Sequence, residues 1–278
     1  MKTVRRILMT LFILLLIVGG LYVYARIIEP GELNTDSTNV IVPEDVSEGT
    51  VVFFSDTHFG RYYNEDRLDR IVTQINGQNP DIVIFGGDLI DNYKRDRSYL
   101  DTQALIEGLS KIDARYGKFA VYGNHDYGGG AEQIYTQIME ESGFTILKND
   151  TVQITEMNLQ ITGYDDLLFG TTPSGDYDLS GGRFSLIVSH EPDTADDISI
   201  PEDAVMVSGH SHGGQITIPF LTEFYLPDGA TKYLRGWYDN LGKNSNISLL
   251  VSRGIGVTGL PFRFLSSPEI NVIHLVHT

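Results

Sequence analysis

Residues 51–58 read VVFFSDTH, a short apolar run that ends in polar residues, as a buried strand entering a loop does. The same alternation continues along the first half of the chain. Buried apolar runs and helical spacing predict, in order, a helix over 67–78, a strand over 82–85, a helix over 102–112, a strand over 119–122 and a helix over 131–142. Strands that alternate with helices are typical of a parallel α/β sheet.

Short strand-like runs with little helical periodicity dominate the second half of the chain. They cover residues 152–155, 159–162, 184–189, 204–208, 215–218, 247–251 and 271–276. Together the two halves predict an α/β fold in which two packed mixed β-sheets are flanked by helices, an αββα sandwich.

Charge and cysteine content exclude several classes of function. The chain has 278 residues and a formal charge of −17, and four of its 20 basic residues precede its first acidic residue, Glu29. The remainder is therefore strongly acidic. This disfavours nucleic acid as a partner, because nucleic-acid binding depends on Lys and Arg contacts to phosphate. The absence of cysteine excludes disulfides, cysteine-ligated zinc, iron–sulfur clusters and a thiol nucleophile.

An uncharged, mostly apolar stretch near the N-terminus predicts a transmembrane helix. It runs from Ile7 to Ala25, which as a helix is about 28 Å long and matches the hydrocarbon core of a bilayer. Three basic residues precede it and favour a cytoplasmic N-terminus: Lys2, Arg5 and Arg6. We therefore expect a single-pass protein of the cell membrane with its domain on the extracytoplasmic side.

The chain then divides into three parts. Residues 1–28 form the anchor with a short cytoplasmic tail, residues 29–44 are polar turn-formers that predict a linker, and residues 45–278 form the folded domain. The alternative is a signal peptide cleaved near Val23-Tyr24-Ala25, which would release a secreted domain.

Polar side chains follow five of the predicted strands and suggest a metal centre. In open α/β sheets, ligands bind beyond the carboxyl ends of the strands. Asp56 and His58 are two residues apart on chain expected to be extended, so both would reach one ion. Carboxylate, imidazole and amide groups lie at such ends, at residues 56–58, 88, 124–125, 190 and 210–212. Seven such groups are too many for one divalent ion and suit two. Each residue taken alone is more simply a turn, cap or structural residue.

Five motifs in this order resemble those of calcineurin-like metallophosphoesterases. They are DTH at 56–58, GDLID at 87–91, GNHD at 123–126, His190, and GHSH at 209–212. The resemblance runs from about residue 51 to the C-terminus. Together with SRGIG at 252–256, the motifs further resemble a bacterial subgroup with an N-terminal membrane segment. Related members act on phosphodiesters or on UDP-diacylglucosamine.

The resemblance implies a ligand set for two divalent ions such as Mn, Fe or Zn, with manganese among the expected metals. Asp56, His58 and His212 would hold one ion. Asn124, His190 and His210 would hold the other, and Asp88 would bridge them.

The resemblance also implies a reaction. A hydroxide held between the ions would attack phosphorus, so the chain is expected to hydrolyse a phosphate ester, either a diester or a monoester. His125 would protonate the leaving oxygen as general acid, and Asp91 would hydrogen-bond His125 and orient it. Asp126 fits a site role or a turn role equally. The alternatives are a non-catalytic metal-binding scaffold and a nuclease on the same fold.

Apolar loops follow the last histidine motif, at residues 216–221, 224–227 and 260–264. They are consistent with ordinary buried strands and loops. They are equally consistent with an apolar rim beside the metal site that accepts the acyl chains of a lipid-linked substrate, with Arg263 contacting a phosphate.

Overall fold

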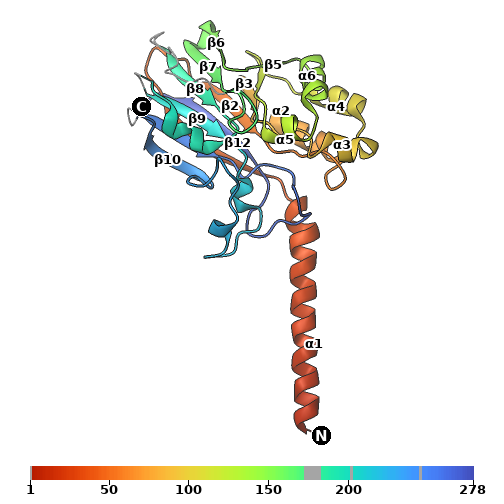
Figure 1. The fold of residues 1–278 in the computed structure, drawn as a ribbon. Coiled ribbons are helices and arrows are strands. Elements are labelled where there is room, and N and C mark those ends of the chain that lie inside the picture. The colour runs from red at the N-terminus through yellow and green to blue at the C-terminus, as the bar shows by residue number, and fades with distance from the viewer. Residues whose placement is uncertain (1, 172–182, 201–202, 244–245) are drawn as a thin grey trace.

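The protein folds into the predicted α/β sandwich with a long N-terminal helix (Figure 1). The structure is a computed structural model, and it describes residues 2–171, 183–200, 203–243 and 246–278. Two six-stranded mixed sheets pack face to face, and the helices that follow the first strands cover the outer side of the first sheet. The fold class is therefore confirmed.

The first sheet has the strand order β1-β12-β2-β3-β4-β5. Its strands are β1 (Asn34–Ile41), β12 (Glu269–Val276), β2 (Gly49–Phe54), β3 (Ile82–Phe85), β4 (Lys118–Ala120) and β5 (Phe144–Ile146). Strands β2 to β5 are parallel, whereas β12 runs antiparallel to β2. Three neighbouring strands therefore end at one edge, where loops can bring their polar residues together.

The second sheet has the order β10-β11-β9-β8-β7-β6. Its strands are β10 (Gly236–Leu241), β11 (Ile247–Val251), β9 (Ala204–Ser208), β8 (Phe184–Val188), β7 (Leu159–Gly163) and β6 (Asp150–Ile154). Strands β7, β8, β9 and β11 are parallel, and the two outermost strands are antiparallel to their neighbours.

Side chains along the central strands point alternately to the two faces of the first sheet and so contribute to two separate hydrophobic cores. Val52 and Phe54 of β2 pack with the helices α2 (Leu68–Asn76), α4 (Thr102–Leu109) and α6 (Glu132–Glu141). Val51 and Phe53 point the other way and pack against apolar residues of the second sheet, such as Leu186. Successive side chains of a strand face opposite sides, so a strand buried on both sides is apolar throughout.

Two strand predictions need correction. The strand predicted at 119–122 ends at Ala120. At 215–218, within the described part of the chain, Ile216 makes only an isolated bridge to Phe264. Positive φ angles at Gly213, Gly214 and Gln215 turn the chain there and prevent a regular strand.

The predicted polar linker over residues 29–44 also needs correction. Residues Asn34–Ile41 form β1, which pairs in parallel with β12 along its whole length. Glu29 is fully buried, and its carboxylate accepts hydrogen bonds from the backbone N–H groups of Leu265 and Ser266 and from the hydroxyl of Ser267. The segment after the N-terminal helix is therefore part of the domain and not a free tether.

The N-terminal helix is exposed and apolar. Helix α1 (Lys2–Val23) continues through short π and 3-10 turns to Gly31, and this 30-residue segment has a mean hydropathy of 2.5 in its most apolar window. None of its residues from 2 to 23 is buried against the domain. By length and composition the helix can cross a membrane, and its place near the N-terminus also suits a signal sequence.

Candidate metal centre

The predicted metal-ligand residues meet at the carboxyl ends of strands from both sheets. Asp56 and His58 follow β2, and Asp88 follows β3. His190 follows β8 in the second sheet. Hydrogen bonds join these loops, since the backbone N–H of His210 donates to the Asp56 carboxylate and the His190 ring nitrogen Nδ1 donates to the Gly86 carbonyl at 2.7 Å.

The backbone at five of these residues is left-handed. The φ angles are positive at Asp56 (54°), His58 (45°), Asp88 (60°), His210 (65°) and His212 (51°). The prediction that Asp56 and His58 share a face because they lie on extended chain is therefore wrong. Left-handed backbone is costly for residues with a Cβ and persists where the surrounding contacts impose it, which is common at functional sites.

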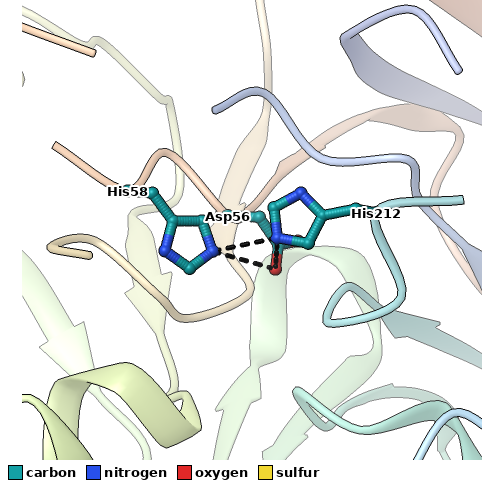
Figure 2. A group of neighbouring side chains, drawn as sticks. All are labelled: Asp56, His58 and His212. Atoms are coloured by element: carbon teal, nitrogen blue, oxygen red, sulfur yellow. Dashed lines mark hydrogen bonds and ion pairs between the residues drawn. The ribbon is translucent and has the colours of Figure 1, made fainter. Parts of the chain in front are cut away.

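The first group of ligand atoms comes from Asp56, His58 and His212 (Figure 2). The Nε2 atoms of His58 and His212 are 2.9 Å apart, and the Nε2 of His212 is 3.6 Å from Oδ1 of Asp56. Such spacing fits atoms that each lie about 2.0–2.1 Å from one shared ion. Burial, with His58 and Arg263 nearby, holds the pKa of His212 well below its usual value, which keeps its ring neutral as a metal ligand requires.

The second group comes from Asp88, His190 and His210. Nε2 of His190 lies 3.2 Å from Oδ2 of Asp88. His190 uses Nδ1 toward Gly86, and His210 uses Nε2 toward the carbonyl of Asp228 at 2.8 Å. The second nitrogen of each ring is thereby left for another partner, and a hydrogen bond of this kind fixes the orientation of a metal-ligating histidine.

Two buried polar atoms show that this donor set fits a metal ion. Among the described residues, Nε2 of His190 and Oδ1 of Asn124 have no hydrogen-bond partner although both are buried. Burying such atoms unpaired is costly, and coordination to a cation would satisfy each of them. Asn124 begins the short helix α5 (Asn124–Gly128) and lines a cavity of about 250 Å³ with Asp88, His125, His210 and His212.

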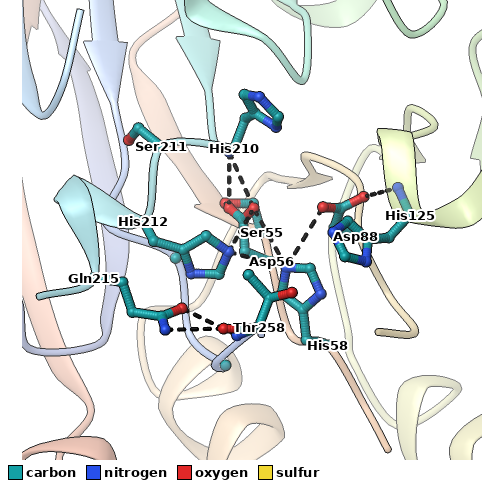
Figure 3. Close-up of polar contacts among 12 residues, drawn as sticks. Ser55, Asp56, His58, Asp88, His125, His210, Ser211, His212, Gln215 and Thr258 are labelled. Carbon is teal, nitrogen blue, oxygen red and sulfur yellow. Dashed lines mark hydrogen bonds and ion pairs between the residues drawn. The ribbon is translucent and has the colours of Figure 1, made fainter. Parts of the chain in front are cut away.

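Asp88 belongs to the second group and also reaches His58 of the first group (Figure 3). Its Oδ2 is 3.4 Å from Nε2 of His58 and 3.2 Å from Nε2 of His190, and its Oδ1 accepts from the backbone N–H of His125. Burial alone would raise the pKa of Asp88, but the surrounding His190, His125 and His58 hold it well below its usual value. The geometry therefore places one ionised carboxylate within reach of both groups.

His125 lies at the mouth of the cavity, with 28% of its side chain exposed. Its Nδ1 donates to the backbone carbonyl of Asp91 at 2.5 Å, which leaves Nε2 for a substrate. Burial would lower the pKa of His125, but Asp88 and the Asp91 carbonyl and carboxylate raise it. A raised pKa increases the protonated fraction of the ring, which is the form in which a general acid donates its proton.

The predicted hydrogen bond between Asp91 and His125 is present, and Asp91 makes it through its backbone carbonyl. The carboxylate of Asp91 is 3.5 Å from Nδ1 of His125 and 3.3 Å from Nδ1 of His58. Its hydrogen bonds go to the hydroxyl of Thr258 at 2.6 Å and to Arg95. Asp91 therefore orients His125 through its backbone, while its side chain faces His58.

Asp126 has the structural role that the sequence left open. Its carboxylate accepts from the backbone N–H groups of Asp88, Leu89 and Gly123, and so ties two ligand-bearing loops together. Gly123 lies against this arrangement, and a side chain there would overlap the Asp88 carboxylate. The GNHD motif thus needs glycine for close approach and aspartate as a cap.

Sequence reasoning missed Thr258 and Gln215, which line the cavity. Gln215 donates to the carbonyls of Thr258 and Leu260 and accepts from the backbone N–H of Thr258. Gln215 follows the GHSHGG run directly and could have been flagged by that position. Nothing in the local sequence marks Thr258.

The predicted substrate contact at Arg263 is wrong. Arg263 is fully buried, and its guanidinium donates to the carbonyls of Gly256 and Ser266 and lies 3.2 Å from Nδ1 of His212. No part of it is open to a ligand. Its role is to hold the His212 ring and the loops around it.

Arg263→Met is expected to weaken the fold and the metal site together. The buried carbonyls of Gly256 and Ser266 would lose their donor, at a cost of roughly 1–3 kcal/mol each. Thermal unfolding and metal titration of the purified protein should show a lower Tm and weaker metal binding, with the KM for a soluble ester unchanged at saturating metal. Arg235→Met, at an exposed arginine, is the control. A raised KM with normal Tm and metal binding would instead restore the substrate-contact role.

The fold and the buried cluster are those expected of a metal-dependent phosphoesterase. Residues 49–214 match the calcineurin-like phosphoesterase family. The chain belongs to this family, whose members are hydrolases that use divalent metal ions.

Three relatives illustrate the range of the similarity. The uncharacterised metallophosphoesterase YkuE of Bacillus subtilis is 35% identical, over 94% of this chain and 91% of that protein. The phosphodiesterase YaeI of Escherichia coli is 27% identical, over 81% of this chain and 82% of that protein. A transmembrane protein with a metallophosphoesterase domain from Danio rerio is 26% identical, over 84% of this chain and 54% of that protein.

Proposed function

We propose that this protein hydrolyses a phosphate ester at a dinuclear metal centre. The observation that carries the proposal is the place of Asp88, which lies 3.4 Å from Nε2 of His58 and 3.2 Å from Nε2 of His190 and so joins two groups of ligand atoms. A single ion would leave one of these groups without a partner. Mn, Fe and Zn all suit a nitrogen and oxygen donor set of this kind.

The ligand residues divide as follows in this proposal. Asp56, His58 and His212 hold one ion. Asn124, His190 and His210 hold the other, and Asp88 is shared. When bound, two such ions supply positive charge to the phosphoryl oxygens and lower the pKa of a water molecule.

The chain supplies the proton for the leaving group through His125. Its Nδ1 is engaged by the Asp91 carbonyl, so Nε2 is the atom that can donate. The ring lines the same cavity as Asp88 and Asn124, where a substrate phosphate would sit. Similarity to a phosphodiesterase supports a diester as the first substrate to test.

A substrate panel tests this function. Full-length protein in detergent should be loaded with Mn, Fe or Zn in turn, analysed for bound metal, and assayed on a soluble monoester, a soluble diester and a nucleotide-linked lipid. Turnover of at least one ester with about two ions per chain is expected. Metal-loaded protein that hydrolyses none of them would point to the non-catalytic scaffold.

We also propose that the domain lies outside the cell membrane and is held there by α1. The basic residues before the apolar stretch favour a cytoplasmic N-terminus, and a relative is named as a transmembrane protein. Protease added to intact spheroplasts should digest the domain. Protection of the domain would overturn the orientation, and recovery of the protein in culture medium would indicate a cleaved signal sequence.

A further inference from the structure

We propose that an apolar rim beside the metal centre enters the surface of the membrane and admits a lipid phosphate ester from it. The rim is defined by Ile218, Phe220, Leu221, Phe224, Tyr225 and Leu260. This inference rests on the proposed function, because it names the class of substrate that the same centre hydrolyses: a phosphate ester that carries acyl chains.

The rim exposes large apolar side chains that the fold does not need. Phe220 and Tyr225 are each 86% exposed and Phe224 is 78% exposed. Between residues 214 and 227 the sequence has only one charged residue, Glu223. Large exposed apolar side chains concentrated in one short segment, uncovered in water, indicate an interaction site.

The rim lies where the N-terminal helix leaves the domain. The backbone N–H of Arg263 donates to the carbonyl of Ala25, and the rings of Tyr22 and Phe262 pack edge to face with centroids 5.6 Å apart. The backbone of Thr217 donates to Phe264, which ties the start of the rim to the same segment. In Figure 1 the loops between β9 and β10 extend below the sheets and lie beside the upper end of α1.

This attachment sets the height of the rim relative to a bilayer. The uncharged stretch that spans the membrane ends at Ala25, so the segment bonded to Ala25 lies at the membrane boundary. The buried carboxylate of Glu29 accepts hydrogen bonds from the backbone N–H groups of Leu265 and Ser266, which also holds the segment after Ala25 to this loop. Tyrosine, which the rim has at Tyr225, is favoured at this boundary. The occupant of the rim is therefore the outer part of a lipid leaflet.

An apolar trough leads from the rim to the metal centre. A cavity of about 470 Å³ is lined by Ile216, Ile218, Leu221 and Leu260. It shares Gln215, Tyr225 and Thr258 with the cavity at the metal ligands. Apolar walls that end at the predicted phosphate position suit a molecule with acyl chains at one end and a phosphate ester at the other.

Depth-dependent fluorescence quenching tests the membrane contact without using catalysis. Trp237 is the only tryptophan of the chain, so Phe220→Trp and, as control, Tyr99→Trp are each made together with Trp237→Phe. Tyr99 is exposed but lies outside the rim. In proteoliposomes, lipids spin-labelled near the headgroup should quench Trp at position 220 and leave Trp at position 99 unquenched. No quenching at position 220 would overturn the proposal.

Kinetics in the same vesicles test the substrate class. The double variant Phe220→Ser, Phe224→Ser should lower kcat/KM by about tenfold on phosphatidic acid or CDP-diacylglycerol, because it removes the apolar contacts of the acyl chains. On soluble bis-nitrophenyl phosphate the kcat/KM of the double variant should equal that of the parent protein. The control variant Tyr99→Ser should have the kcat/KM of the parent protein on every substrate. Hydrolysis of the soluble ester but of neither lipid would refute the lipid substrate and leave the phosphoesterase function intact. Hydrolysis of no ester would refute the phosphoesterase function itself.

Discussion

Asp88→Asn is expected to lower kcat by about 10³-fold or more and to reduce bound metal at both positions. The change removes the negative charge of Asp88, which lies within 3.4 Å of Nε2 of both His58 and His190. Loss of one group that stabilises charge in an active site commonly lowers kcat by about 10²–10³-fold, and here loss of metal adds to it. Asparagine tolerates the left-handed backbone at position 88, where φ is 60°. Metal analysis, kcat and far-UV circular dichroism should therefore show lost metal and activity in a folded protein.

The control for this experiment is the same substitution at a surface aspartate. Asp69 on α2 has 85% of its side chain exposed, so Asp69→Asn should leave metal content and kcat unchanged. An Asp88→Asn protein with two bound ions and normal turnover would remove Asp88 from the centre.

His125→Asn is expected to keep bound metal and to slow turnover by roughly 10²–10⁴-fold, the usual loss for a general acid. The hydrogen bond from residue 125 to Asp88 is made by the backbone and survives the substitution. The loss should shrink for a nitrophenyl ester, because its leaving group departs without a proton. Measuring kcat for one ester with an alkyl leaving group and one with a nitrophenyl group separates acid catalysis from metal binding.

His277→Asn is the matched control for His125→Asn. His277 follows the end of β12, which runs antiparallel to β2 and so ends at the opposite edge of the sheet from Asp56. The His277→Asn variant should have the kcat of the parent protein on both esters. Equal losses on the two esters for His125→Asn would argue that His125 acts in binding and not as the acid.

The two-layer fold was predictable because most of its signals are local. The continuous apolar runs at β2, β3 and β9 reflect strands buried on both faces, and the structure has strands there. β1 was not predicted, because it has no such continuous apolar run. Six of its eight residues, 34–39, are polar, and it lies at the edge of the sheet, where backbone pairing with β12 stabilises it without a buried apolar face.

The candidate ligands were also predictable, because strand ends converge at one edge of each sheet and polar residues there stand out against apolar strands. The structure brings Asp56, His58 and His212 together, and likewise Asp88, His190 and His210. Their roles in binding metal remain predictions for the experiments above.

The amino-acid sequence by itself determined the sandwich, the apolar N-terminal helix and which polar residues gather at the strand ends, since each depends on neighbours along the chain. Only the tertiary structure decided what Arg263 and Glu29 do. Arg263 meets a ring 51 residues away in sequence, and Glu29 meets a loop 236 residues away. Contacts over such separations leave no pattern in the local sequence. The same holds for the backbone of Asp56 and His58, whose left-handed conformation is imposed by packed loops from other parts of the fold.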